Sequence, residues 1–417
     1  MTLTQRTRAR LALAFGIAAL IGGGVFLWRV AGVRNPPPPK TRLAVAQQRV
    51  ADIAALGKQM FSDPSLSASG RQSCATCHSP SHDYGPPNDL ATQFGGPDMK
   101  HVGARAVPSL KYLQAVPPFI EHFMGSEEDG NEGLDQGPTG GLTWDGRAPT
   151  RQAQAFLPLL DPDEMANPDL DAVIAKVKAA PYAGTVRKLY GDKVFDTKKE
   201  ILAAIVQSLD YFQQTPAEFF PFDSKYDAYR RGKAQLNERE LNGLKLFLAP
   251  DKGNCVSCHR FSNPRVLPIF NDFGLVALGV PRNPAIAANA DPDYYDMGLC
   301  GPKRTDLSTH LEYCGLFRSP TLRNVARRKV FFHNGYFHDL RSVVEFYNLR
   351  DVNPERFYPR KAEGSVVKFD DLPTRQRGNV NMDPPFGGKP GGKPALTEPE
   401  VDDLVAFLNT LNDGYKP

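Results

Sequence analysis

Two C-x-x-C-H pentapeptides constrain this chain more than any other feature of its sequence. They are Cys74-Ala75-Thr76-Cys77-His78 and Cys255-Val256-Ser257-Cys258-His259. In a c-type cytochrome the two thiols add to the two vinyl groups of haem, and the histidine that follows binds the iron. A single C-x-x-C could instead be a redox dithiol or half of a zinc site. Because each copy carries histidine in its fifth place, the pair predicts two covalent c-type haems.

The N-terminal segment predicts a membrane anchor followed by a stiff spacer. Three arginines among the first ten residues precede an uncharged run over residues 11–28. That run exceeds the signal-peptide core of about 7–15 residues and approaches the ~20 needed to span a bilayer. The positive-inside rule puts the N-terminus in the cytoplasm. We expect an inner-membrane anchor in residues 1–34, a proline-rich tether in residues 35–42 and a periplasmic body, with a cleaved signal and a soluble periplasmic protein as the alternative.

Composition describes a globular body with many ordered turns. The chain has 37 prolines and 36 glycines, yet 41% of its residues are hydrophobic, so long loops are expected rather than disorder. A net charge of +4 is too small at this length to indicate nucleic-acid binding. The two cysteines outside the haem motifs, Cys300 and Cys314, predict a disulfide in an oxidising compartment, with two free thiols as the alternative.

Helical periodicity flanks each haem motif and forms an internal repeat. Residues 45–61 carry an apolar stripe through Val50, Ile53, Ala54, Leu56 and Met60. Residues 236–248 repeat the arrangement, with a stripe through Leu241, Leu244, Phe247 and Leu248. Near the end, Thr397 and Glu400 predict a capping box that opens a closing helix.

A helix, a haem motif and a closing helix make up the layout of a cytochrome c fold. No alternating run is strong enough to predict a central sheet. The sequence therefore predicts a mainly α fold with two cytochrome c-like domains in tandem, each with one covalent haem, after the N-terminal anchor. The first domain is expected over residues 43–235 and the second over residues 236–417.

Several further motifs occur in a recognisable order between and after the two haem motifs. They are Trp144-Asp145-Gly146-Arg147-Ala148, Pro158-Leu159-Leu160-Asp161-Pro162-Asp163-Glu164-Met165, Arg318-Ser319-Pro320-Thr321-Leu322-Arg323-Asn324-Val325 and Phe332-His333-Asn334-Gly335. With the haem motifs, they resemble the bacterial diheme cytochrome c peroxidase and MauG superfamily over roughly residues 45–415, and Tyr347 favours the MauG-like branch.

The resemblance implies where the chemistry lies. Peroxide reacts at the N-terminal haem of that family, and the C-terminal haem stores or relays electrons. Counting from Trp144, Glu164 matches the distal acid/base and Gln154 matches a distal amide. Pro158 matches a residue that restricts access above the iron. Trp144 itself matches the tryptophan that carries electrons between the haems, although it could also be a core aromatic residue.

The resemblance also gives the axial ligands, with His78 and His259 on the proximal side. Classical diheme peroxidases cap the first iron with a histidine sixteen residues after the motif, where this chain has Phe94. We therefore expect an open first haem, with His101 as the rival ligand on a longer loop. At the second haem the peroxidases use a methionine where this chain has Tyr347, as MauG-type enzymes do. Tyr347 is the expected ligand and Met297 the rival.

One feature of the family is weakened in this chain. These enzymes hold a calcium between the domains through an asparagine before a Pro-Ser/Thr turn. The corresponding stretch, residues 105–109, contains no asparagine and begins with Arg105. Because Ca²⁺ requires several oxygen ligands, calcium remains possible but doubtful.

The resemblance implies an enzyme that uses hydrogen peroxide, with two modes of action. A diheme cytochrome c peroxidase takes electrons from a small cytochrome c or a cupredoxin through the C-terminal haem. A MauG-like enzyme uses a high-valent diheme state to oxidise tryptophan or tyrosine of a partner protein. A non-catalytic electron-transfer cytochrome is less consistent with the sequence, because it would need neither Glu164 nor an open iron.

Overall fold

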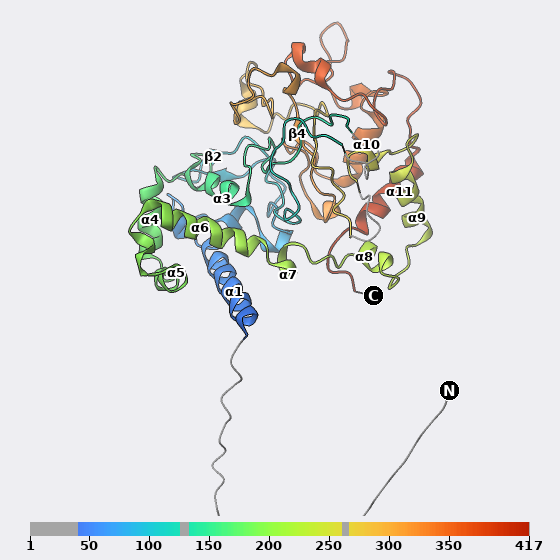
Figure 1. Cartoon of the computed structure of the whole chain (residues 1–417). Coiled ribbons are helices and arrows are strands. Elements are labelled where there is room, and N and C mark those ends of the chain that lie inside the picture. Colours follow the sequence, from blue (N-terminus) through green and yellow to red (C-terminus); the bar gives the residue numbers. More distant parts are fainter. Residues whose placement is uncertain (1–40, 126–132, 261–266, 417) are drawn as a thin grey trace, which may run out of the picture. The chain divides into compact units, whose positions relative to one another are not determined.

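A computed structural model describes residues 41–125, 133–260 and 267–416 of the chain (Figure 1). The helices are α1 (Arg42–Phe61), α2 (Cys74–Cys77), α3 (Arg151–Leu160), α4 (Leu170–Ala179), α5 (Ala183–Tyr190), α6 (Lys198–Gln213), α7 (Pro216–Phe219), α8 (Lys225–Arg230), α9 (Glu238–Leu248), α10 (Leu340–Leu349) and α11 (Glu398–Asn409). Strands β1 (Phe94–Gly95) and β2 (His101–Val102) form one antiparallel pair, and β3 (Leu275–Val276) and β4 (Phe317–Arg318) form another. The predicted mainly helical fold is therefore confirmed.

Two large hydrophobic cores, and a small cluster of Leu275, Leu299 and Leu307, lie in the described part of residues 46–417, which form one compact unit. The first core takes its buried side chains from between Ile53 and Phe219, and the second takes them from between Tyr226 and Leu411. We call the parts of the chain around these cores the N-terminal half and the C-terminal half. The division between two domains at residues 235 and 236 stays a prediction.

A close helix crossing is repeated in the two cores. A Cβ atom on Gly57 of α1 would lie 1.9 Å from the Ser208 carbonyl oxygen of α6. A Cβ atom on Gly243 of α9 would lie 2.0 Å from the Asp403 carbonyl oxygen of α11. In Figure 1, α9 and α11 lie side by side, as these contacts require. Only glycine allows the backbones to approach so closely.

Three aromatic rings pack beside each crossing in the same arrangement. In the N-terminal half they are Phe61, Tyr84 and Phe212, with ring centroids 5.3 to 6.1 Å apart. In the C-terminal half they are Phe247, Phe270 and Phe407, with centroids 5.3 to 6.3 Å apart. All these pairs are edge-to-face, the geometry that aromatic quadrupoles favour. The internal repeat predicted from the haem motifs therefore extends to the packing behind them.

The sequence predicts the start of α11 correctly, but it misassigns one residue each in the buried faces of α1 and α9. The predicted capping box is confirmed, since the Thr397 N–H donates to Glu400 Oε2 at 2.8 Å and opens α11. Two members of the predicted stripes are wrong, because Val50 is 49% exposed and Leu248 is 42% exposed. In α9 the Gly243 crossing turns Leu246 into the core instead.

The predicted anchor in residues 1–34 and the tether up to residue 40 lie outside the described residues. Across residues 41–125, 133–260 and 267–416, no helix is both long enough and apolar enough to cross a membrane.

Candidate functional site

Each C-x-x-C-H motif opens onto its own cavity. The His78 pocket, about 1460 Å³, is lined by Cys74, Cys77 and His78 together with residues of α3 and the turn after it. The His259 pocket, about 1620 Å³, is lined by Cys255, Cys258 and His259 together with residues of α10 and α11. The sequence therefore places both thiols and the imidazole of each motif on the wall of one cavity.

Local backbone geometry brings each histidine back over its motif. The N–H of His78 donates to the Cys74 carbonyl at 2.8 Å, and the N–H of His259 donates to the Cys255 carbonyl at the same distance. At the first motif, the Ser73 N–H donates to Thr76 Oγ1 at 2.9 Å and fixes the start of α2. One turn of chain thus holds the three reactive side chains of a motif together.

Both motif histidines are neutral and present one lone pair. His78 Nδ1 lies 3.1 Å from the Tyr84 carbonyl oxygen, and His259 Nδ1 lies 3.2 Å from the Phe270 carbonyl oxygen. Because a carbonyl only accepts, Nδ1 carries the proton and Nε2 keeps its lone pair. Burial lowers the pKa of each imidazole to about 4. A neutral imidazole oriented by a carbonyl is what an axial iron ligand requires.

The motif cysteines do not have the character of a redox dithiol. Burial raises the pKa of Cys74, Cys77 and Cys255 to about 12 and also raises that of Cys258. Reactive C-x-x-C pairs instead have a lowered thiol pKa, since the thiolate is the nucleophile. Buried thiols beside an oriented imidazole fit covalent haem attachment better.

Helices α3 and α10 stand in equivalent places in the two halves. Both have 10 residues, and each begins at a side-chain cap, Thr150 for α3 and Asp339 for α10. Eight residues beyond the cap lie Pro158 in α3 and Tyr347 in α10, and each lines the pocket of its own half. A proline side chain cannot bind a metal, whereas a phenol can. The repeat therefore presents a phenol to the His259 pocket at the position where the His78 pocket has a proline.

Tyr347 sits among aromatic rings at the His259 pocket. Its ring stacks on Phe386 at 5.2 Å and on Phe332 at 6.2 Å between centroids. Burial raises the pKa of its phenol, so a nearby positive charge such as ferric iron is needed to favour the phenolate. The rival Met297 does not line this pocket; it lies in the segment before Cys300.

Glu164 projects into the His78 pocket together with the other predicted distal residues. Gln154, Pro158 and Trp144 line the same cavity. Glu164 is exposed to the open space of the pocket, although protein atoms lie densely around its carboxyl group. Burial, followed by the charge of Asp161, raises its pKa to about 7. A carboxyl with that pKa can both take up and release a proton near neutral pH.

His101, the rival ligand of the first haem, lies away from the cavity. Its side chain is 45% exposed, and Nδ1 is 3.4 Å from Asp163 Oδ1. It does not line the His78 pocket, although Phe94, which pairs with Val102 across β1 and β2, does. This geometry favours the open first haem.

Trp144 lines both haem pockets. Its ring is 8% exposed, and Nε1 donates to the Ala106 carbonyl at 2.8 Å. The repeat places His333 at the equivalent position of the C-terminal half, six residues before the helix cap. His333 is buried and stacks on Phe317 with centroids 3.5 Å apart.

Two arginines of the pocket lining, the buried Arg318 and the half-buried Arg328, were not recognised from the sequence. Arg318 lines both haem pockets, and its Nη1 has no hydrogen-bond partner among the described residues. Arg328 lines the His259 pocket, and burial lowers the pKa of both guanidinium groups to about 10. A buried cation needs an anion, and a haem carries two propionates. The orphaned Nη1 is therefore an independent sign that the cavities fit haem. Its only sequence signal is that Arg318 begins a motif whose residues have no assigned roles.

The stretch that corresponds to the family's calcium site, where calcium was doubtful from the sequence, carries a guanidinium with two acidic partners. Arg105 Nη1 lies 2.7 Å from Asp145 Oδ2, and Nε and Nη2 lie 2.6 and 2.7 Å from the two carboxylate oxygens of Asp296. Burial alone would lower the pKa of Arg105, but the two carboxylates outweigh it and raise the pKa. The Arg105 guanidinium thus neutralises the carboxylates of Asp145 and Asp296.

The chain is similar to a described protein family and to several known proteins. The family described as di-haem cytochrome c peroxidase matches residues 51–235. The methylamine utilization protein MauG of Paracoccus denitrificans is 35% identical over 390 residues, which cover 89% of this chain and 92% of that protein. The cytochrome c551 peroxidase of Nitrosomonas europaea is 28% identical over 353 residues, 81% of this chain and 85% of that protein.

A solved structure shares the fold. The diheme peroxidase BthA of Burkholderia thailandensis superposes with a TM-score of 0.75 and 39% sequence identity, covering 87% of this chain and 86% of that chain. The similarity extends over both halves, and so over both pockets.

Proposed function

Because this chain belongs to the di-haem cytochrome c peroxidase and MauG family, we propose that hydrogen peroxide reacts at its His78 pocket and that electrons pass through its His259 pocket. The protein is a diheme oxidoreductase with two c-type haems. The observation that carries the assignment of the pockets is the repeat of α3 and α10. Pro158, which cannot bind a metal, lines the His78 pocket at the position where Tyr347, whose phenol can, lines the His259 pocket.

When bound, each haem supplies an iron that exchanges electrons, and the open one also takes up hydrogen peroxide. The proposed roles of the protein follow from the contacts in the pockets. Cys74 and Cys77, and likewise Cys255 and Cys258, hold the two haems. His78 binds one iron, and His259 with Tyr347 binds the other. Arg318, with its unpaired Nη1, binds propionate.

Glu164 is the proposed acid and base of the His78 pocket. Its carboxylate accepts the proton from the peroxide oxygen that approaches the iron and returns it to the departing oxygen. Gln154 orients the peroxide, and Pro158 narrows the access to it. Trp144, which lines both pockets, lies on the path that electrons take between them.

The pH dependence of the reaction tests this assignment in the wild-type protein. The carboxylate form of Glu164 is active, so the rate should be constant above a midpoint near 7, the pKa of that carboxyl. Below it the rate should fall about tenfold per pH unit as the carboxyl becomes protonated. Stopped-flow absorbance after addition of hydrogen peroxide measures the rate. A flat profile between about pH 5 and pH 9 would remove Glu164 from the reaction.

A second function is favoured by Tyr347. The resemblance to MauG implies oxidation of tryptophan or tyrosine in a partner protein, and Tyr347 lies where MauG-type enzymes carry tyrosine. An anionic oxygen ligand stabilises oxidised iron relative to reduced iron, which suits an oxidant of proteins. The peroxidase mode instead calls for a small cytochrome c or cupredoxin as electron donor. Both modes share the His78 pocket.

We place the protein in the periplasm. The Cys300–Cys314 disulfide and the four haem cysteines suit an oxidising compartment. Residues 11–28 are the proposed inner-membrane anchor, with a cleaved signal as the alternative. Carbonate extraction of membranes from the native host distinguishes the two, because an anchored protein stays in the pellet.

A further inference from the structure

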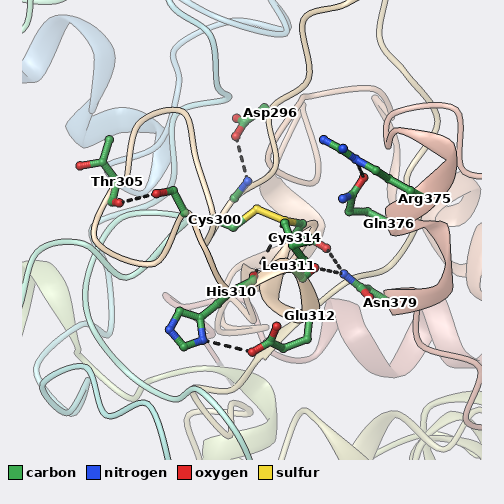
Figure 2. The surroundings of a disulfide bond; sticks show 12 residues. Asp296, Cys300, Thr305, His310, Leu311, Glu312, Cys314, Arg375, Gln376 and Asn379 are labelled. Carbon is green, nitrogen blue, oxygen red and sulfur yellow. Dashed lines mark hydrogen bonds and ion pairs between the residues drawn. A yellow bond between two sulfur atoms is a disulfide. The ribbon is translucent and has the colours of Figure 1, made fainter.

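Residues 300–314 of the C-terminal half form a loop closed at its base by the Cys300–Cys314 disulfide (Figure 2). We call it the disulfide loop. Figure 2 also shows Asn379 Nδ2 donating to the carbonyl oxygens of Leu311 at 2.7 Å and Cys314 at 3.0 Å. Covalent closure restricts the conformations open to a loop. The disulfide and the hydrogen bonds from Asn379 therefore both restrict the loop that carries these side chains.

The disulfide loop reaches the N-terminal half through Arg304. This side chain is 7% exposed, and its guanidinium carbon lies 3.9 Å from the centre of the Phe119 ring. Nη1 donates to the Asp145 carbonyl oxygen at 3.1 Å, while Nε and Nη2 each lie 2.8 Å from Asp306. A stacked, hydrogen-bonded guanidinium of this kind fixes the loop against the segment that carries Trp144.

Lys303, the neighbouring residue, lines the His78 pocket. Its Nζ lies 3.2 Å from Asp161 Oδ2 and 3.8 Å from Asp163 Oδ2, and the side chain is 31% exposed. A lysine of the C-terminal half thus neutralises carboxylates in the lining of the His78 pocket, whose acid/base residue belongs to the N-terminal half.

Asp161 and Asp163 flank the turn that carries Glu164. The Glu164 N–H donates to the Asp161 carbonyl oxygen at 3.0 Å, and the Asp163 N–H donates to Asp161 Oδ1 at the same distance. Lys303 binds the other carboxylate oxygen of Asp161. Lys303 therefore binds Asp161, the residue whose carbonyl and carboxylate oxygens accept the hydrogen bonds of this turn.

The charged groups around Glu164 come from several parts of the chain. Asp161 and Asp163 raise its pKa, and Lys303 and Arg147 lower it. Arg147 is itself bound to Asp145 at 2.9 and 3.0 Å, so part of its charge is already neutralised. Lys303 thus contacts both aspartates of the turn, whereas the titratable His101 contacts Asp163 alone, with Nδ1 3.4 Å from Oδ1.

We propose that Lys303 is a positioning residue for Glu164, and that the disulfide loop couples the C-terminal half of the protein to the reaction at the His78 pocket. The proposal rests on the function proposed above for Glu164. The opposing interpretation is an ordinary surface ion pair, which contributes little to stability and does not change the titration of Glu164.

Infrared titration of the Glu164 carboxyl in the diheme protein, without peroxide, tests the proposal. The band that disappears in Glu164→Gln identifies the group. In Lys303→Met the titration midpoint should move up by about one pH unit, the low end of the effect of a nearby opposite charge. In Lys303→Arg the midpoint should stay at the wild-type value. Lys198→Met, which removes an exposed ion pair with Asp171, is the matched control and should not move it.

The peroxide reaction should follow the titration. At pH values well below the midpoint Lys303→Met should react about tenfold more slowly than wild type, and the two rates should converge at alkaline pH. An unchanged midpoint in folded Lys303→Met would leave Lys303 as a surface ion pair and overturn the proposal. If Glu164→Gln itself reacts at the wild-type rate, the proposed function of the pocket fails instead.

The disulfide loop is tested by Cys300→Ser combined with Cys314→Ser. The midpoint should move in the same direction as in Lys303→Met, and adding Lys303→Met should shift it little further, because both changes act through one contact. Asn379→Ala loosens the same loop without touching the disulfide and should give a smaller shift of the same sign. A wild-type midpoint in both loop variants would show that Lys303 does not depend on the loop.

Discussion

Replacing Glu164 by glutamine should slow the reaction with hydrogen peroxide by about 10²–10⁴-fold, the usual cost of losing a general acid–base group. Glutamine has nearly the same shape but takes up no proton, so both haems and their resting absorption spectra should be retained. Stopped-flow absorbance at a fixed pH above 7 measures the rate.

An exposed carboxylate of the same half provides the control. Asp171→Asn removes a side chain that is 60% exposed and outside both pockets, so it should react at the wild-type rate. Wild-type kinetics in Glu164→Gln would mean that Glu164 is only a solvated carboxylate in the turn after α3.

Replacing Arg323 by methionine should destabilise the fold by about 3–5 kcal/mol, because it leaves a buried carboxylate without its partner. Arg323 and Asp227 are both fully buried and form two hydrogen bonds of 2.6 and 2.8 Å. The guanidinium also lies 5.2 Å from the Tyr112 ring and 4.9 Å from the Phe222 ring. It therefore stabilises packing between the N-terminal and C-terminal halves.

The destabilisation of Arg323→Met should itself depend on pH. Burial alone would raise the pKa of Asp227, but Arg323 outweighs burial and holds it below its usual range. A depressed carboxyl pKa contributes stability at neutral pH that is lost as the pH falls through the acid range. The difference between variant and wild type should therefore shrink on acidification.

Urea unfolding followed by circular dichroism measures both effects. Arg239→Met is the matched control: Arg239 is 61% exposed and pairs with Asp403 at 2.9 Å, so this variant should unfold at nearly the wild-type urea concentration. Equal losses of unfolding free energy in Arg323→Met and Arg239→Met would contradict a stabilising role for the buried Arg323–Asp227 pair.

The sequence predicts those features of the fold and of the site that have a local chemical signal. The C-x-x-C-H spacing is enough to bring Cys74, Cys77 and His78 to one cavity wall, because the backbone turn is determined within five residues. The capping box of Thr397 is also local, and α11 begins where it predicts. The position of Glu164 in the His78 pocket follows from its spacing to Trp144 through the family motif rather than from any local signal.

What the sequence could not predict depends on contacts between distant residues. Lys303 and Asp161 meet across 142 positions, and nothing near Lys303 distinguishes it from a surface lysine. Val50 fits an amphipathic pattern but is exposed, because periodicity identifies a helical face without saying where its partner helix ends. The equivalence of Pro158 and Tyr347 requires α3 and α10 to be compared in space, since their sequences differ.

We propose that the two haem pockets differ in ligation, with the His78 side open and Tyr347 bound on the His259 side. Low-temperature electron paramagnetic resonance of the as-isolated diferric protein tests it most directly. We expect one high-spin and one low-spin signal of equal amount, with the low-spin signal altered in Tyr347→Phe and unaltered in Met297→Leu. Two low-spin signals in the wild type would contradict this difference in ligation. A low-spin signal that is lost in Met297→Leu and unchanged in Tyr347→Phe would also contradict it.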